Sequence, residues 1–362
     1  IGFKMRADMT THQMFEPMYG SIILEMVSDS PAGMLLGETT KEYTFESCGE
    51  KLDMAELQEI WESKLEPVYP YRKAGPAVEK INGSLTAPAA PKIGVAKPKV
   101  IIPVFPGTNC EYDTAKAFAR AGADPEILVV RNLTPADVAE SCEALVKAID
   151  ASQIVMLPGG FSGGDEPDGS AKFIASFFRN PAVTEAVRRL LQQRDGLMLG
   201  ICNGFQALIK LGLVPYGDIR PITACDPTLT FNTIGRHQSM LVHTRVASTG
   251  SPWLSKCEVG EMHTVAISHG EGRFVAPQGV LDTMLRNGQV ATQYVDLTGV
   301  PTMDQRFNPN GSVLAIEGIT SPDGRVFGKM GHSERSGNGL YVNVPGDKYQ
   351  PIFEAGVGYF AA

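Results

Sequence analysis

The chain has 362 residues, of which 43% are hydrophobic and 20% are charged, and this composition is typical of a globular protein with about two domains. Its formal net charge is −8 and it contains no basic block, so nothing favours binding to nucleic acid or to an anionic membrane. No apolar run approaches the ~20 residues of a membrane span, and the N-terminus shows no signal-peptide pattern.

The cysteine pattern indicates a reducing compartment. The six cysteines form no C-x-x-C pair, which favours neither a zinc site nor a disulfide scaffold: Cys48, Cys110, Cys142, Cys202, Cys225 and Cys257. We therefore expect a cytoplasmic protein with no metal site. Because Ile1 opens what resembles the interior of a domain, we also expect the chain to be part of a longer protein.

The first segment, residues 1–72, contains few predicted elements. Residues 20–27 (GSIILEMV) predict a strand. Asp53 and Glu56 have the spacing of a capping box, and the apolar residues that follow predict a helix that buries one face, at Met54, Leu57, Trp61 and Leu65. Some 70 residues with so few elements bury little apolar surface alone, so we expect this segment to dock on something larger.

The next segment, residues 73–98, is rich in Ala, Gly and Pro and has little apolar periodicity. This composition predicts a linker, which places a domain boundary between residues 72 and 99.

From residue 99 onward, predicted strands alternate with predicted helices. The strands are at 99–105, 126–131, 153–157 and 197–201, and the helices at 111–121, 134–149, 170–179, 181–193 and 203–211. This alternation predicts an α/β fold with right-handed βαβ units and an open, mostly parallel sheet covered on both faces. After Gly212 the pattern becomes richer in β-structure, with candidate strands at 239–247, 264–268, 289–295, 312–319 and 325–330.

Cys202 lies between the predicted strand 197–201 and the predicted helix 203–211, with Gly200 and Gly204 two residues away on either side. Small flanking residues permit the sharp turn that exposes a nucleophile at a helix N-terminus, where the thiolate is favoured. The alternative is a free cysteine buried as a small hydrophobic residue. The two glycines favour the nucleophile.

A base for this thiol is available near the C-terminus. His332 follows the predicted strand 325–330, and Glu334 comes two residues later. In extended chain these two side chains point to the same side, so the carboxylate can orient the imidazole and complete a Cys202–His332–Glu334 triad. The alternative is a solvated histidine and glutamate on a surface loop.

The glycine-rich loop at residues 157–165 (LPGGFSGGD) follows a predicted strand, and its backbone N–H groups can converge on a developing oxyanion. Such loops also bind phosphate, but no Lys-Ser/Thr pair follows, which excludes a Walker-type loop. The N–H of Asn203, beside the nucleophile, is the second candidate donor.

The residues of the elbow, the glycine-rich loop and the histidine–glutamate pair resemble those of a known enzyme family. GICNGFQ, residues 200–206, is similar to the G-x-C-x-G-x-Q elbow of the class I (triad) glutamine amidotransferases, and the Pro-Gly-Gly loop and His-x-Glu pair stand in that family's order. Five further stretches resemble the glutaminase domain of the phosphoribosylformylglycinamidine synthases of purine biosynthesis: FPGTNCEYDTAKAF, LPGGFSGGDEPDGSAKF, SHGEGRF, FNPNGSVLAIEGITSPDGRVFGKMGHSER and GLYVNVPG. Residues 1–72 resemble, less specifically, the tail of the synthetase region that precedes that domain.

The resemblance implies a flavodoxin-like sheet and a division of roles. Cys202 would attack the carboxamide of L-glutamine to give a thioester and ammonia, His332 would transfer the proton, and Glu334 would orient His332. The N–H groups of Gly160 and Asn203 would form the oxyanion hole.

The remaining implied roles concern substrate and partner. Gln206 would help to place glutamine, and Ser268, His269 and Gly270 would contact its amino-acid head. The partner would be the synthetase region, which would hold ATP and Mg²⁺ and use the ammonia to make formylglycinamidine ribonucleotide, so no cofactor is expected in this chain itself.

Several alternatives stay open. Cys110 also precedes a helix but has Tyr112 where the elbow needs glycine, which favours a packing role. His269 could be a structural histidine rather than part of the glutamine pocket. A DJ-1/PfpI-like cysteine hydrolase and a catalytically silent glutamine-binding docking module are the rival functions, and Gln206 together with the complete triad argues against both.

Overall fold

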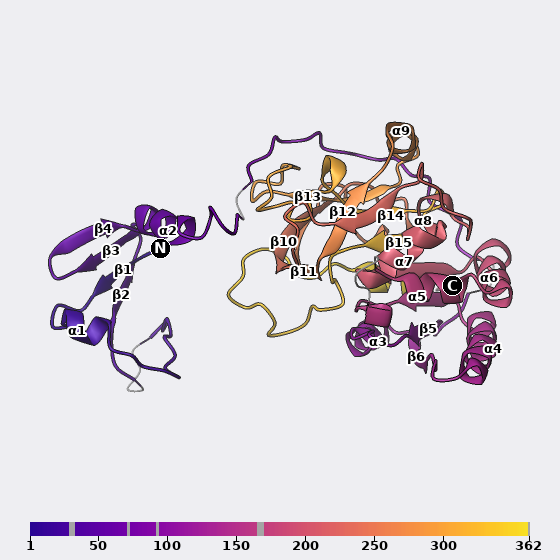
Figure 1. Ribbon diagram of the computed structural model, residues 1–362, viewed down its shortest axis with the longest axis horizontal. Coiled ribbons are helices and arrows are strands. Elements are labelled where there is room, and N and C mark those ends of the chain that lie inside the picture. Colours follow the sequence, from indigo (N-terminus) through magenta and orange to yellow (C-terminus); the bar gives the residue numbers. More distant parts are fainter. Residues whose placement is uncertain (29–32, 71–72, 92–93, 165–169, 361–362) are drawn as a thin grey trace. The chain divides into compact units, whose positions relative to one another are not determined.

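The computed structural model describes residues 1–28, 33–70, 73–91, 94–164 and 170–360 (Figure 1). The chain divides into two compact units, residues 1–71 and 72–362. None of the helices in the described part of the chain combines the length and hydrophobicity that a membrane crossing requires.

The N-terminal unit is a small α+β structure. Its four-stranded sheet has the order β2-β1-β3-β4, with β1 at Gly2–Met5, β2 at Gly37–Thr40, β3 at Thr44–Ser47 and β4 at Glu50–Asp53. Its helices are α1 (Thr11–Met14) and α2 (Met54–Ser63). Asp53 caps α2 as expected, because its carboxylate accepts the N–H groups of Ala55 and Glu56.

Two predictions for this unit are wrong. Residues 21–26 contain no strand, and their apolar side chains are exposed, as at Ile22, Ile23 and Leu24. Helix α2 buries none of its residues: Trp61 is 80% exposed and Leu57 is 37% exposed. The apolar pattern is typical of burial, but no described part of this small unit covers these side chains.

The second unit is built on a nine-stranded sheet with helices on both faces (Figure 1). The strand order is β11-β10-β13-β14-β15-β8-β7-β5-β6. The strands are β5 (Lys99–Val104), β6 (Asp124–Val129), β7 (Ile154–Leu157), β8 (Leu197–Ile201), β10 (Gln238–Val246), β11 (Met262–His269), β13 (Val290–Val295), β14 (Ile316–Thr320) and β15 (Val326–Lys329). The pairs from β15 to β6 are parallel and those from β11 to β15 are antiparallel. The α/β class is therefore confirmed, but the antiparallel half follows the β-rich C-terminal sequence rather than the βαβ pattern.

The helices of this unit largely coincide with the predictions. They are α3 (Glu111–Arg120), α4 (Pro135–Ala151), α5 (Lys172–Phe178), α6 (Pro181–Arg188) with a π-helical turn at Arg189–Gln193, α7 (Asn203–Leu211), α8 (Leu213–Tyr216), α9 (Gln278–Arg286) and α10 (Ile352–Gly358). The prediction missed α8, α9, α10 and a two-stranded sheet of β9 (Thr228–Phe231) and β12 (Glu271–Val275). These are short elements without a long periodic pattern.

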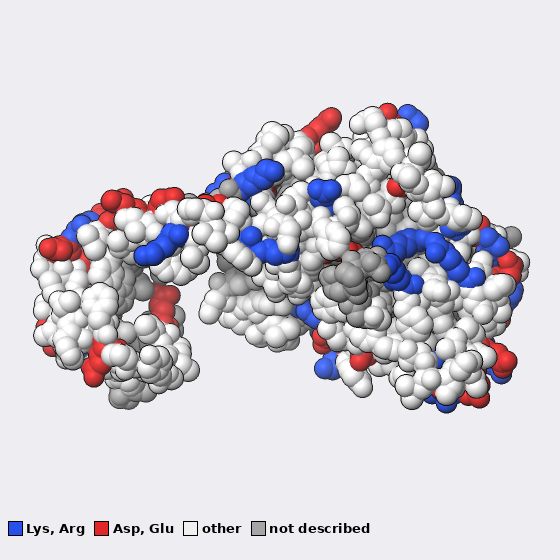
Figure 2. All heavy atoms as spheres, viewed as in Figure 1, with Lys and Arg blue, Asp and Glu red and all other residues white. Residues whose placement is uncertain are grey.

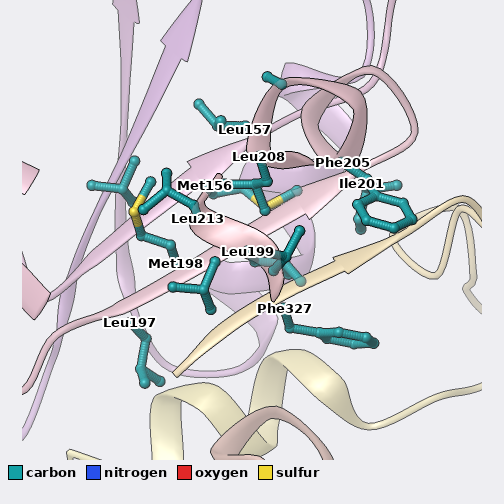
Figure 3. Packing of buried hydrophobic residues seen from close by; sticks show 14 of the residues in the cluster. Met156, Leu157, Leu197, Met198, Leu199, Ile201, Phe205, Leu208, Leu213 and Phe327 are labelled. Atoms are coloured by element: carbon teal, nitrogen blue, oxygen red, sulfur yellow. The ribbon is translucent and has the colours of Figure 1, made fainter. Parts of the chain in front are cut away.

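The core lies around the centre of this sheet, next to Cys202. Strand β8 is buried along its whole length because helices cover both faces of its sheet. The side chains of β7, β8, α7, α8 and β15 pack together there, as Figure 3 shows for Met156, Leu157, Leu197, Met198, Leu199, Ile201, Phe205, Leu208, Leu213 and Phe327. The turn after β8 is therefore held by a rigid scaffold on both sides.

The predicted linker is bound along the second unit. Its described residues contain no helix and only an isolated β-bridge, from Ala77 to Thr302. Backbone hydrogen bonds nevertheless fix it, because the N–H of Gly83 donates to Ala247 at 2.7 Å and that of Val95 donates to Phe360 at 2.7 Å. The segment is thus part of the second unit rather than a free spacer.

On the face shown in Figure 2, a group of Lys and Arg side chains lies together on the second unit, Asp and Glu side chains lie elsewhere, and large areas carry no charge.

Candidate active site

Cys202 occupies the strand-to-helix turn that the sequence predicts. It is the N-cap residue of α7, directly after β8, and its backbone has φ +53° and ψ −106°. A positive φ is uncommon for a residue with a Cβ, and such backbone strain is concentrated at functional sites. The turn directs the sulfur of Cys202 into a cavity and leaves only 4% of the residue exposed.

The two glycines beside Cys202 are required by close packing. A Cβ on Gly204 would stand 1.9 Å from the carbonyl oxygen of Leu157, and a Cβ on Gly200 would stand 2.6 Å from Leu208 Cδ1. Any larger residue would push α7 away from the sheet. The glycines thus allow the helix to begin immediately after the nucleophile.

The sheet topology brings His332 to the same place. Strand β15 lies next to β8 and runs parallel to it, so the carboxyl ends of both strands are at the same edge. His332 follows β15, and its N–H donates to the carbonyl of Ala266 at 2.8 Å. A Cβ on Gly159 would stand 2.7 Å from His332 Cε1 and 3.5 Å from Cys202 Cβ, so both side chains pack against this glycine.

Glu334 completes the triad. Its Oε1 lies 2.6 Å from Nδ1 of His332, and both residues are almost fully buried. Burial by itself would lower the pKa of His332, but the Glu334 carboxylate and the Cys202 sulfur outweigh it and raise that pKa well above its usual range. Burial would raise the pKa of Glu334, yet His332 holds it below its ordinary value. The pair therefore favours a charged imidazolium beside the sulfur.

The cavity in front of Cys202 has a volume of ≈ 280 Å³. Six of the nine predicted site residues line it: Gly160, Cys202, Gln206, Ser268, His269 and Gly270. His332, Glu334 and Asn203 are not among the lining residues. The site residues therefore come together from β7, β8, β11 and β15, which are far apart in the sequence.

The predicted oxyanion donors flank the sulfur. Asn203 is the first residue of α7, and its side-chain Oδ1 accepts the N–H of Ser162 at 3.2 Å, which ties the glycine-rich loop to the elbow. Gly160 has φ +148°, and a Cβ there would stand 2.6 Å from the carbonyl oxygen of Gly107. Among the described residues, the Gly160 N–H donates no hydrogen bond to another backbone group. Residue 165, the end of the predicted loop, lies outside the described residues.

The comparisons with known proteins agree with this geometry. A family model described as "CobB/CobQ-like glutamine amidotransferase domain" matches residues 97–360. The chain belongs to this glutamine amidotransferase family.

Similar proteins carry a more specific name. "Phosphoribosylformylglycinamidine synthase subunit PurQ" of Aquifex aeolicus is 34% identical over 244 residues, which cover 66% of this chain and 91% of that protein. The protein of the same name from Methanococcus maripaludis is 35% identical over 245 residues, which cover 66% and 82%. Among solved structures, PurLQS from Thermotoga maritima aligns with a TM-score of 0.52 and 25% identity, over 73% of this chain and 99% of that chain.

The residues that the sequence predicts as substrate contacts, Gln206, Ser268, His269 and Gly270, line the cavity. Gln206 Nε2 donates to the carbonyl oxygen of Glu271 at 2.5 Å, and the thiol of Cys202 faces the carbonyl oxygen of Ser268 at 3.8 Å. His269 is 2% exposed, and burial, with His332 and His237 nearby, lowers the pKa of its imidazole to about 3. His269 is thus neutral, and its ring packs under Gly272, where a Cβ would stand 2.4 Å from His269 Cε1.

Sequence reasoning missed four lining residues with polar side chains: Ser170, Arg236, His237 and Glu271. Glu271 is 5% exposed, and its Oε2 accepts the N–H of Ser170 at 2.8 Å. His237 Nε2 lies 2.9 Å from Ser268 Oγ. Glu271 stands inside the quoted SHGEGRF motif, so its position was available as a signal, whereas Arg236 lies in no recognised motif.

Cys110 lies closer to the triad than its predicted packing role suggests. Its Sγ is 3.9 Å from His332 Nδ1 and 3.1 Å from Arg335 Nη2. Glu334 already occupies Nδ1, and Cys110 does not line the glutamine-amidotransferase cavity. Cys202 is therefore the cysteine that a substrate in this cavity can reach.

Two groups of described residues bring three potential metal ligands within 4.8 Å of one another: Cys110, His332 and Glu334, and Glu261, His263 and Asp347. In the first group the Arg335 guanidinium already contacts Cys110, and a cation there disfavours a metal. In the second, His263 Nε2 lies 3.1 Å from Glu261 Oε1, and burial lowers the pKa of His263. We assign a metal to neither group.

Proposed function

We propose that this chain is the glutaminase part of a phosphoribosylformylglycinamidine synthase. It hydrolyses L-glutamine to glutamate and ammonia through a thioester on Cys202, and the ammonia serves the ATP-dependent conversion of formylglycinamide ribonucleotide to formylglycinamidine ribonucleotide. The observation that carries the proposal is the His332–Glu334 pair beside an elbow cysteine in a chain similar to PurQ subunits.

The first half of the reaction forms the thioester. His332 takes the proton of the Cys202 thiol, and the sulfur attacks the carboxamide carbon of glutamine. The N–H groups of Gly160 and Asn203 stabilise the oxyanion of the tetrahedral intermediate. His332 then gives the proton to the leaving nitrogen, the C–N bond breaks, and ammonia departs. Glu334 keeps the imidazole in one orientation and stabilises its charged form.

The second half regenerates the cysteine. Water attacks the thioester carbon while His332 accepts its proton, the C–S bond breaks, and the thiolate recovers a proton from the imidazolium. Glutamate is released. The same base and the same oxyanion donors serve both halves, so one triad is sufficient for the whole hydrolysis.

The wall of the cavity fits the zwitterionic head of glutamine. Among the described lining residues, Glu271 contributes an anion for the α-ammonium group and Arg236 a cation for the α-carboxylate. Gln206 and the backbone of residues 268–270 supply neutral hydrogen-bonding groups on the same side. This combination of charges selects an amino acid over a simple amide.

The proposed partner is the synthetase region, either on the same chain or on a separate one. PurLQS, to which this chain is similar, supports such an assembly. ATP and Mg²⁺ belong to the synthetase region in this proposal, and no step assigned to this chain passes through them. That residues 1–72 are the tail of that region stays a prediction.

Release of glutamate and ammonia from glutamine tests the proposal. We expect weak activity for the chain alone, higher activity with a synthetase partner and its ligands, and a loss on the order of 10⁶-fold in Cys202→Ala, as for other triad nucleophiles. Full activity of Cys202→Ala would remove the triad assignment. Binding of glutamine without turnover by the assembled enzyme would favour a docking module, and turnover of other substrates but not glutamine would favour a DJ-1/PfpI-like hydrolase.

A further inference from the structure

A buried ion pair lies directly behind the catalytic base. Lys329, the last residue of β15, and Glu317, in β14, both have fully buried side chains, and Lys329 Nζ lies 3.5 Å from Glu317 Oε1. A lysine is rarely buried completely, because the loss of hydration of its ammonium group is unfavourable unless partners replace the water. The groups that form hydrogen bonds with Lys329 and Glu317 therefore indicate the role of this ion pair.

Most of these partners belong to the segment that carries His332. The Lys329 ammonium donates to the carbonyl oxygen of Gly331 at 3.0 Å and to Ser333 Oγ at 2.8 Å. Glu317 Oε1 accepts the N–H of Gly331 at 2.6 Å. The residues immediately before and after His332 are thus both bound to this one pair.

The outer members of the network hold the pair in place. The hydroxyl of Thr292, on β13, donates to Glu317 Oε2, and Ser333 Oγ donates to Gln350 Oε1 at 2.7 Å. Gly331 provides the space: a Cβ there would stand 2.9 Å from Glu317 Oε1 and 3.2 Å from Lys329 Nζ. All polar atoms of the pair therefore have partners, which is the condition under which a buried network fixes one conformation.

Lys329 also contacts the nucleophile through its backbone. Its carbonyl oxygen accepts the N–H of Cys202 at 2.9 Å, since β15 and β8 are parallel neighbours. One residue is therefore bonded to the nucleophile by its main chain and to both neighbours of the base by its side chain.

We propose that Lys329, paired with Glu317, is the positioning residue that sets the His332 imidazole against the Cys202 sulfur. The proposal rests on the function proposed above and deepens it. Lys329 does not line the cavity, so it acts through His332 and not through contact with glutamine. Its role is thus in the orientation of the proton-transfer group.

The test uses Lys329→Met, which keeps the length of the side chain and removes the charge, in the chain assembled with its synthetase partner. We expect kcat for glutamine hydrolysis to fall about 10²-fold with little change in KM, because a shift of the base by about 1 Å affects proton transfer and not the cavity wall. Lys147→Met, at an exposed position on α4, is the matched control and should behave like the wild type.

A second readout separates positioning from general stability. The rate at which a glutamine-like chloroketone alkylates Cys202, measured against pH, reports the protonation of His332 beside the sulfur. In Lys329→Met the part of this profile that belongs to His332 should shift to lower pH, because the Cys202 sulfur helps to raise the pKa of the imidazole and the ring would no longer stand against it. If the unpaired Glu317 prevents folding, the charge-neutral variant Lys329→Met with Glu317→Gln replaces the single one and should show the same fall in kcat and the same shift.

Wild-type kcat and an unshifted alkylation profile in a folded Lys329 variant would overturn the positioning role while leaving the proposed function intact. A wild-type assembly that releases no ammonia from glutamine would instead refute the proposed function. The two failures are therefore distinguishable.

Discussion

A single methyl group at Gly159 should disable the triad. A Cβ built on this residue stands 2.7 Å from His332 Cε1, 3.1 Å from Cys110 Sγ and 3.5 Å from Cys202 Cβ. Carbon atoms pack at about 3.5–4.0 Å, so Gly159→Ala requires His332 to move by roughly 1 Å. Gly159 has no positive φ, and the backbone itself tolerates alanine.

The expected losses of rate and of stability follow from this displacement of His332. A misplacement of about 1 Å in a catalytic group lowers the rate about 10²-fold, and overpacking of a tight site costs about 1–3 kcal/mol of stability. We therefore expect Gly159→Ala to stay folded at 25 °C, to retain its KM for glutamine within a few-fold, and to lose about two orders of magnitude in kcat.

The assay is steady-state release of ammonia from glutamine with the synthetase partner present, with the free energy of unfolding measured on the same samples. Gly279→Ala is the matched control, because a Cβ there meets nothing within 4 Å and the residue is in helix α9, where alanine is favoured over glycine. A folded Gly159→Ala with wild-type kcat would show that His332 does not pack against Gly159 in the active enzyme, and the reasoning from this contact would be wrong.

Three further predictions concern the charges and thiols of the site. Glu334→Gln should lower kcat by about 10²–10⁴-fold. It should also destabilise the fold, most strongly between about pH 4.5 and 6.5, which denaturation at several pH values would measure. The reason is that the depressed pKa of Glu334 contributes stability that is lost as the pH falls below 4.5, and the raised pKa of His332 contributes stability that is lost as the pH rises above 6.5. A difference that is independent of pH would contradict the ion pair. A glutamine-like electrophile should label Cys202 and spare Cys110, which is 1% exposed and outside the cavity; peptide mapping that finds the label mainly on Cys110 would count against this assignment. Glu271→Gln should raise KM for glutamine about 10–100-fold with a smaller change in kcat, as expected for one lost hydrogen bond to a charged group, and an unchanged KM would show that Glu271 does not bind the substrate ammonium.

The elbow could be predicted from sequence because its determinants are local. The apolar run of β8, the two glycines and the amphipathic start of α7 all lie within about fifteen residues of one another, although the close contact of Gly204 is with Leu157 on β7. The capped start of α2 was predictable for the same reason.

Burial was less predictable than secondary structure. The apolar face of α2 has the spacing of a core helix, but Trp61 is 80% exposed, because burial depends on whether another surface covers the helix and not on the spacing itself. Residues 21–26 are apolar enough for a strand but pair with none of the described strands, and a strand needs a partner for its backbone groups.

The sequence by itself determined the chemistry of this protein: a cysteine raised at a strand-to-helix turn, a histidine with a carboxylate two positions later, and the alternation that makes an α/β sheet. Only the tertiary structure decided how these groups meet. Strand β15 pairs with β8, which brings His332 to Cys202 across 130 residues of chain. The folded sheet also buries Lys329 and Glu317 and brings Cys110, at the start of α3, within 3.9 Å of His332. The physical reason is that turns and helices depend on near neighbours, whereas strand order depends on the summed packing of the whole core, which no short stretch of sequence contains.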